Sequence, residues 1–171
     1  MLADVGANVI KVEPPSGDEN RLWPPFTPDQ ASCNFNSVNR GKRGITLDLK
    51  TMAGQSVLRS LVTKADVLIH NFLPDTAARL GLGPEMWSET NPRLVVCEMS
   101  GYGAMGQMAN KPGYDLMMQA FAGAMAMTGY EDSPPVRTGL SFIDMSTGMS
   151  AYGAITTALL ARKRTGRGTT V

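Results

Sequence analysis

Short apolar runs alternate with segments of helical periodicity along the chain, and this alternation constrains the fold more than any other feature. The apolar runs, rich in β-branched residues, lie at 8–13, 45–49, 65–70 and 93–99. Segments with helical spacing of apolar residues lie between or after them, at 52–64, 76–80, 84–90, 114–128 and 145–161. Strands that alternate with helices predict an α/β fold, in which an open, mainly parallel sheet is covered by helices on both faces.

The ends of the expected strands predict where a ligand binds. In open α/β sheets, ligands bind beyond the carboxyl ends of the strands. The residues that follow Glu13, Leu49, His70 and Met99 therefore lie at one edge of a Rossmann-like sheet. This places Lys50, Asn71 and Tyr102 on the same side.

The composition excludes several classes of protein. The chain has 171 residues, 43% of them hydrophobic, which suffices for one domain with a core. Its 16 basic and 15 acidic residues nearly cancel, so nucleic acid and anionic membranes are not expected as partners. Only Cys33 and Cys97 could form a disulfide, and no apolar run approaches the ~20 residues that cross a bilayer. We expect a cytoplasmic protein.

Both ends of the chain resemble the interior of a larger domain. The first residues look like the end of a helix that closes at Gly6, and Thr169 begins what looks like a further strand. We therefore expect a domain that is truncated at both ends.

Two segments have weaker signals. Residues 14–37 hold five of the eleven prolines and are expected to form an irregular surface segment. Asn39–Arg43 places three cations around Gly41, which could bind phosphate. A solvated basic turn is the interpretation that we favour for these five residues, because short basic runs are common.

A glycine motif and a single histidine do not support dinucleotide binding or histidine-based catalysis. Gly101–Gly106 fits G-x-G-x-x-G after a strand, but Pro112 and Gly113 interrupt the segment where a dinucleotide-binding fold needs its helix. We interpret these glycines as turn residues. His70 is the only histidine, which excludes catalytic triads and metal sites that need several imidazoles, and at a strand end we expect it to be structural.

Asp144 is the candidate reactive group. It follows the apolar residues Leu140, Phe142 and Ile143 and comes directly before the helix expected over 145–161. Aspartate is a favoured N-cap residue, so simple capping is one interpretation. The apolar approach favours the other, in which the carboxylate is a covalent nucleophile at a helix start.

Several ordered motifs carry a resemblance to a known family. They lie at 2–13, 39–43, 71–72, 79–81, 101–103, 144–148 and 162–168. In these motifs the chain resembles the family III CoA-transferases (CaiB/BaiF family), whose members include formyl-CoA transferase, carnitine CoA-transferases and, by divergence, α-methylacyl-CoA racemase. The resemblance covers essentially the whole chain, as part of the family's large domain, without the small domain and the C-terminal return segment.

The resemblance implies a mechanism, a site and partners. Asp144 attacks an acyl-CoA thioester, and coenzyme A then passes through an aspartyl thioester to an acceptor carboxylic acid. No metal or redox cofactor is implied. The parent enzymes are interlocked homodimers. The positions that match the family's CoA contacts are Leu47, Asp48, Leu49, Lys50, Asn71, Phe72, Arg79 and Tyr114.

Two alternatives to CoA transfer remain. The racemase has a histidine thirty residues before the aspartate, where this chain has Tyr114, and a neutral phenol is a poor partner for two-base proton transfer. CoA transfer is therefore the favoured prediction, and racemisation or epimerisation of a 2-methylacyl-CoA is the alternative. The third possibility is a catalytically inactive CoA-binding fragment whose aspartate only caps a helix.

Overall fold

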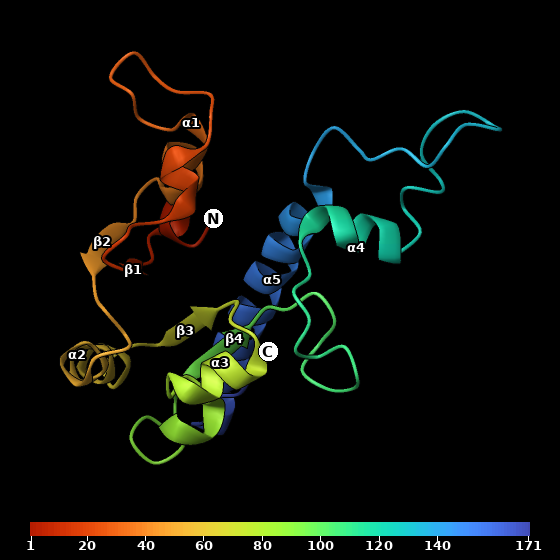
Figure 1. Ribbon diagram of the computed structural model, residues 1–171. Coiled ribbons are helices and arrows are strands. Elements are labelled where there is room, and N and C mark those ends of the chain that lie inside the picture. The colour runs from red at the N-terminus through yellow and green to blue at the C-terminus, as the bar shows by residue number, and fades with distance from the viewer. The chain divides into compact units, whose positions relative to one another are not determined.

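The computed structural model describes residues 1–171 as two compact units, Met1–Leu61 and Val62–Val171 (Figure 1). Each unit contains helices and one pair of parallel strands. The expected α/β class with parallel strands is confirmed. None of the helices combines the length and apolar character that a bilayer crossing requires.

The first unit is built around the parallel pair of β1 (Ile10–Glu13) and β2 (Arg43–Thr46). Ile10 pairs with Arg43 and Glu13 with Thr46, and the Leu47 amide continues the ladder by donating to the Glu13 carbonyl at 2.9 Å. The unit also contains the 3-10 turns η1 (Ala3–Val5) and η2 (Glu19–Leu22) and the helices α1 (Cys33–Asn39) and α2 (Met52–Val62).

Helix α1 lies where the sequence predicted only irregular structure. Ser32 is its N-cap, and the Ser32 hydroxyl accepts from the Phe35 amide at 3.2 Å and donates to the Trp23 carbonyl at 2.7 Å. The expectation was wrong for this part of the segment because a single buried serine both starts the helix and ties it to the preceding loop.

Paired cations characterise the first unit. The Arg21 guanidinium donates to both Glu13 carboxylate oxygens, at 2.8 and 2.9 Å, and lies 3.9 Å from the centre of the Phe35 ring. This hydrogen bonding lowers the pKa of Glu13 against the opposing effect of burial. In the basic turn, Arg40 pairs with Asp4 at 2.8 Å and Lys42 Nζ donates to Asn39. These pairings use cations that the phosphate interpretation required to be free.

The second unit is built around the parallel pair of β3 (Val67–His70) and β4 (Val95–Glu98). Val67 pairs with Val95 and His70 with Glu98. On the other side of β4, Thr170 forms a parallel bridge with Val96, so the strand expected at the end of the chain is present in its first residues. The helices are α3 (Pro74–Arg79), α4 (Asp115–Phe121) and α5 (Phe142–Thr165), with a 3-10 turn η3 (Pro84–Trp87).

The core of the second unit lies between β4 and the elements that pack on it. Helix α5 runs beside β4, and α4 lies against the N-terminal part of α5 (Figure 1). The buried side chains include Leu82, Trp87, Val95, Val96, Cys97, Met118, Ile155 and Ala158. Burial of this apolar surface, at roughly 25 cal/mol per Å², supplies the main favourable term for folding the unit.

Two helices differ from their expected bounds. The helix expected over 114–128 ends at Phe121, because Ala122 leaves helical geometry and Gly123 takes a φ of 78°. The helix expected to begin at Met145 begins at Phe142. The earlier start changes the position of Asp144, as described below.

Gly101 and Gly113 bring two backbone segments into close contact. A Cβ on Gly113 would lie 2.6 Å from the Gly101 Cα, so neither residue can carry a side chain without a shift of the backbone. The contact joins the segment that leaves β4 to the segment that enters α4. Gly103 and Gly106 of the rejected dinucleotide motif have positive φ in turns, as expected, whereas the packing role of Gly101 was not predicted.

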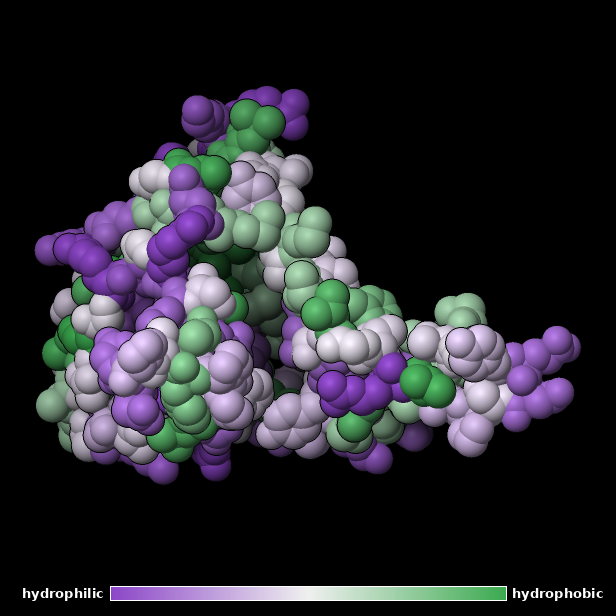
Figure 2. All heavy atoms as spheres, turned by 90° about the horizontal axis from the view of Figure 1, so that it is seen from above, coloured by the Kyte–Doolittle hydropathy of each residue, from purple (hydrophilic) through white to green (hydrophobic).

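Apolar side chains also remain on the surface. Figure 2 shows apolar residues scattered among polar ones on the face that is seen from above. Along α5, Met145, Met149 and Leu160 are all exposed, whereas Ile155 and Ala158 are buried. Most of the surface of this long helix therefore contacts no other part of the chain.

Candidate active site

Asp144 lies in the first turn of α5, two residues inside the helix. The N-cap is Ser141, whose side chain makes no capping hydrogen bond. The expectation that Asp144 is the N-cap is therefore wrong. The expectation fails because another residue accepts the free amide hydrogens at the helix start, so the Asp144 carboxyl does not cap the helix.

That residue is Asp115, the first residue of α4. Its Oδ1 accepts from the amides of Ile143 at 3.0 Å and Asp144 at 3.2 Å. These are the second and third residues of α5, whose amides have no partner within the helix and are normally satisfied by an N-cap side chain. Asp115 therefore caps α5 from a neighbouring helix.

Two carboxyl groups thus lie close together at the start of one helix. Asp144 is an exposed residue, and the pKa of its carboxyl is raised by partial desolvation and, second, by the Asp115 carboxylate. A helix N-terminus ordinarily favours an anion, so these two effects act against the helix dipole. The Asp144 carboxylate is consequently more basic than an ordinary aspartate.

A buried glutamine holds this arrangement in place. Gln119 is 2% exposed, and its Nε2 donates to Asp115 Oδ2 at 2.5 Å and to the Leu140 carbonyl at 3.4 Å. Its Oε1 accepts from the Thr138 amide at 3.0 Å. Neither Asp115 nor Gln119 was predicted from the sequence as a site residue. The available signal was their i, i+4 spacing at a helix start, which is typical of hydrogen-bonded Asp–Gln pairs.

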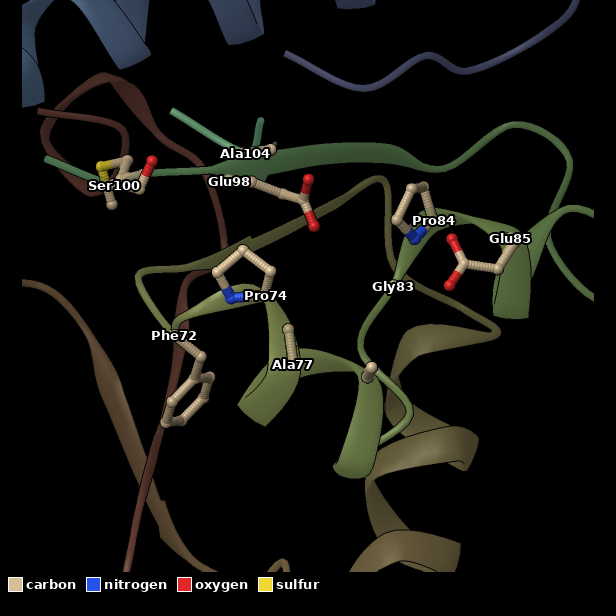
Figure 3. Close-up of a pocket in the computed structure, with 11 residues that line it drawn as sticks. Phe72, Pro74, Ala77, Gly83, Pro84, Glu85, Glu98, Ser100 and Ala104 are labelled. Atoms are coloured by element: carbon tan, nitrogen blue, oxygen red, sulfur yellow. The ribbon is translucent and has the colours of Figure 1, made fainter. Parts of the chain in front are cut away.

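A cavity of about 170 Å³ opens beyond the carboxyl ends of β3 and β4 (Figure 3). Figure 3 shows the Glu98 carboxylate directed toward the space that Pro74 and Pro84 border. The other walls are mostly apolar and are formed by Phe72, Ala77, Ala78, Met99 and Ser100, among others. The cavity therefore lies at the edge where the sequence predicted a ligand.

His70 supports this edge from inside. It is 8% exposed, and its Nε2 lies 3.4 Å from Glu98 Oε1. Burial lowers the pKa of His70, and Glu98 only partly opposes this effect. A neutral, buried imidazole agrees with the structural role that was expected for the only histidine.

The predicted CoA contacts of the second unit lie at two places. Asn71 and the 40%-exposed Phe72 directly follow β3, and Arg79, the last residue of α3, is exposed. The Phe72 ring lines the cavity. Tyr114 is the N-cap of α4, is 74% exposed and precedes Asp115, so it belongs to the place where α4 meets α5.

The remaining predicted contacts, Leu47, Asp48, Leu49 and Lys50, lie in the first unit. They form the turn between β2 and α2, in which Asp48 Oδ1 accepts from the Lys50 amide at 3.0 Å. The Leu49 carbonyl accepts from Gln55 Nε2 at 3.1 Å. The strand expected over 45–49 ends at Thr46, so these residues follow the strand rather than complete it.

Each unit has a pair of parallel strands and helices, and in the second unit the cavity opens beyond the carboxyl ends of the strands. The family model of CoA-transferase family III matches residues 1–171. The chain belongs to this family, as the sequence motifs indicated.

Individual proteins that resemble the chain are CoA-transferases or CaiB/BaiF family proteins. The chain is 43% identical over 169 residues to the succinyl-CoA:glutarate CoA-transferase of Mus musculus and 44% identical over 170 residues to the acetyl-CoA:oxalate CoA-transferase of Acetobacter aceti. The alignments cover 98% of this chain but 38% and 43% of those proteins. A CaiB/BaiF family structure from Brucella suis superimposes with a TM-score of 0.93 at 41% identity, over 99% of this chain and 46% of that one. The chain thus spans less than half the length of the relatives that it matches.

Proposed function

We propose that the protein transfers coenzyme A between an acyl-CoA and a carboxylic acid, with Asp144 as the covalent nucleophile. The observation that carries this proposal is the carboxyl of Asp144 in the first turn of α5. A different residue caps that helix, and both partial desolvation and Asp115 raise the pKa of Asp144. Residues 1–171 form part of the large domain of an interlocked homodimer that works in the cytoplasm.

In the first half-reaction, an Asp144 oxygen attacks the carbonyl carbon of the acyl-CoA. The carbon–sulfur bond breaks, and the CoA thiolate leaves a mixed anhydride of Asp144 and the acyl group. The thiolate then attacks the Asp144 carbonyl carbon and releases the donor as a carboxylate. Asp144 now carries coenzyme A as a thioester.

The second half-reaction reverses these steps with the acceptor acid. The acceptor carboxylate attacks the Asp144 thioester and expels the thiolate, which returns to the acceptor acyl carbon. The products are the new acyl-CoA and the free Asp144 carboxylate. Both covalent intermediates are activated acyl compounds, so the transfer potential is kept without an external energy source.

The local structure supports this role in two ways. A more basic carboxylate is a stronger nucleophile, which follows from the raised pKa of Asp144. The positive end of the α5 dipole favours the negative charge that develops on the Asp144 carbonyl oxygen during attack by the thiolate. We assign Tyr114, which is exposed and directly precedes Asp115, to the contacts with the substrate.

We assign the cavity beside α3 to an uncharged part of coenzyme A. Its walls are mainly apolar, and Glu98 would repel the phosphates but accept a hydrogen bond from an amine or amide. The exposed cations Lys50 and Arg79 are assigned to the phosphates. Asn71 and Phe72 complete the contacts of the second unit, and Leu47, Asp48 and Leu49 those of the first.

Hydroxylamine trapping tests the proposal. The full-length gene product is incubated with an acyl-CoA and hydroxylamine, which converts either covalent intermediate to an aspartyl hydroxamate. Peptide mapping should locate the hydroxamate at Asp144 and should find none in the Asp144→Ala variant. An unmodified Asp144 together with full transfer activity of Asp144→Ala would refute the assignment. Deuterium incorporation at the α-carbon without any acceptor acid would instead indicate the racemase activity.

A further inference from the structure

We propose that Gln119 is a positioning residue for the Asp144 carboxyl, which it orients through Asp115 and the backbone of residues 138–140. The inference rests on the proposed function of Asp144. The inference goes beyond that function because Gln119 is buried and acts on Asp144 without a role in contacting the substrate.

The Gln119 amide forms hydrogen bonds through both its nitrogen and its oxygen. Both Nε2 hydrogens have acceptors, Asp115 Oδ2 and the Leu140 carbonyl, and Oε1 accepts from the Thr138 amide. One side chain thereby joins α4 to two points of the segment that leads into α5. Because the residue is 2% exposed, water cannot replace these partners without opening the unit.

The two carboxylate oxygens of Asp115 have different hydrogen-bond partners. One oxygen accepts from Gln119 and the other from the amides of Ile143 and Asp144. The orientation that Gln119 imposes on the carboxylate therefore decides how it meets the first turn of α5. A change at Gln119 therefore reaches Asp144 through Asp115, without direct contact between Gln119 and Asp144.

Gln119 also restrains a surface segment that leads into α5. Leu140 and Ser141 precede the helix, and Leu140 is 68% exposed, so apolar packing does not hold its side chain. The Leu140 carbonyl is fixed by Gln119 and by the Thr138 hydroxyl at 2.7 Å. Without Gln119, residues 138–140 lose the two hydrogen bonds that join them to this buried side chain.

The test compares Gln119→Leu with Gln107→Leu, the same substitution at an exposed glutamine of the same unit. A displaced nucleophile costs roughly 100-fold in rate, so Gln119→Leu should form the Asp144 hydroxamate about 10- to 100-fold more slowly, with little change in CoA affinity. The acidic limb of its pH–rate profile should move toward that of free aspartate, as the Asp115 carboxylate leaves its fixed position. Gln107→Leu should match the wild type in rate and pH profile.

A paired substitution separates positioning from general stability. Gln119→Glu places two carboxylates against each other and should be slower than Gln119→Leu. In the double variant D115N/Q119E, donor and acceptor are exchanged, so the hydrogen bond between the two side chains is restored. We expect the double variant to be at least 5-fold faster in trapping than Q119E, and more stable, which is roughly the effect of one recovered buried hydrogen bond.

The outcomes distinguish this inference from the proposed function. No hydroxamate in the wild type would refute the role of Asp144. The pKa of Asp144, measured by carboxyl NMR, would then still test the positioning. Wild-type trapping that Gln119→Leu leaves unchanged, with the same pH limb, would overturn the positioning role alone. If Gln119→Leu does not fold, a double variant no better than Q119E in stability or rate overturns it.

Discussion

The cap that Asp115 supplies to α5 makes a quantitative prediction. Asp115→Ala removes the acceptor of the Ile143 and Asp144 amides, and loss of a helix N-cap costs about 1 kcal/mol. It also leaves one Nε2 hydrogen of the buried Gln119 without its acceptor, which costs about 1–3 kcal/mol. The sum is roughly 2–4 kcal/mol in the free energy of unfolding of the second unit.

Thermal unfolding followed by circular dichroism measures this loss. For a unit of about a hundred residues, 1 kcal/mol corresponds to roughly 4 °C, so Asp115→Ala should lower Tm by about 8–16 °C. Asp115→Asn is the matched control, because its amide oxygen still accepts from the two backbone amides while its amide nitrogen faces a donor on Gln119. We expect the asparagine variant to lose about half as much stability.

The same two variants separate charge from capping. Both remove the negative charge that contributes to the raised pKa of Asp144, so in both the pKa of Asp144 should fall. Only Asp115→Ala should combine this fall with the full loss of stability. A Tm of Asp115→Ala within about 2 °C of the wild type, which is under 1 kcal/mol, would refute the capping role. An unchanged Asp144 pKa in Asp115→Asn would refute the electrostatic coupling.

Three further predictions follow from other contacts. Asp144→Asn should end covalent trapping yet raise Tm at neutral pH. The native state binds the Asp144 proton more tightly than the unfolded chain does, so ionisation of Asp144 as pH rises lowers the stability of the wild type. Below the pKa of free aspartate the variant and the wild type should unfold alike, and a lower Tm of the variant at neutral pH would contradict this prediction. Gly113→Ala should lower the free energy of unfolding in urea by about 1–3 kcal/mol, because the added Cβ forces the backbone away from Gly101. Gly139→Ala is the control, since a Cβ at Gly139 meets no other atom. Equal urea midpoints of the two variants would contradict the packing of Gly113 against Gly101. The pKa of Glu13 is lowered, so its contribution to stability is present above the pKa of free glutamate and is lost as pH falls through the lowered pKa. Arg21→Met should therefore flatten the acid-side slope of the free energy of unfolding of the first unit against pH. An unchanged slope would contradict the pairing of Arg21 with Glu13.

The sequence predicted the fold class, and it predicted the strand-end edge at which the cavity lies, because both depend on local patterns. The apolar run that became β4 is almost completely buried, and strands buried on both faces are recognisable as continuous apolar segments. The residues that follow β3 and β4 then had to lie at one edge, and the cavity beside Phe72 and Glu98 lies there.

The details at Asp144 could not be predicted in the same way. Whether α5 begins at Phe142 or Met145 depends on which group accepts the first free amides, and the acceptor, Asp115, lies 28 residues from Ile143 in the sequence. Local capping preferences describe only neighbours in sequence, so they assigned the cap to Asp144 itself. Similarly, the early end of α4 depends on Gly123, which a pattern of small apolar residues did not distinguish from helix.

Oxygen-isotope transfer tests the central claim most directly. Each complete turnover through Asp144 leaves one oxygen of the acceptor carboxylate in the Asp144 side chain, because the acceptor oxygen bridges the second anhydride and stays when the thiolate attacks the acceptor acyl carbon. After turnover of the full-length gene product with an ¹⁸O-labelled acceptor acid, peptide mapping should find ¹⁸O in Asp144 and in no other carboxylate. Efficient transfer without label in Asp144 would contradict the account.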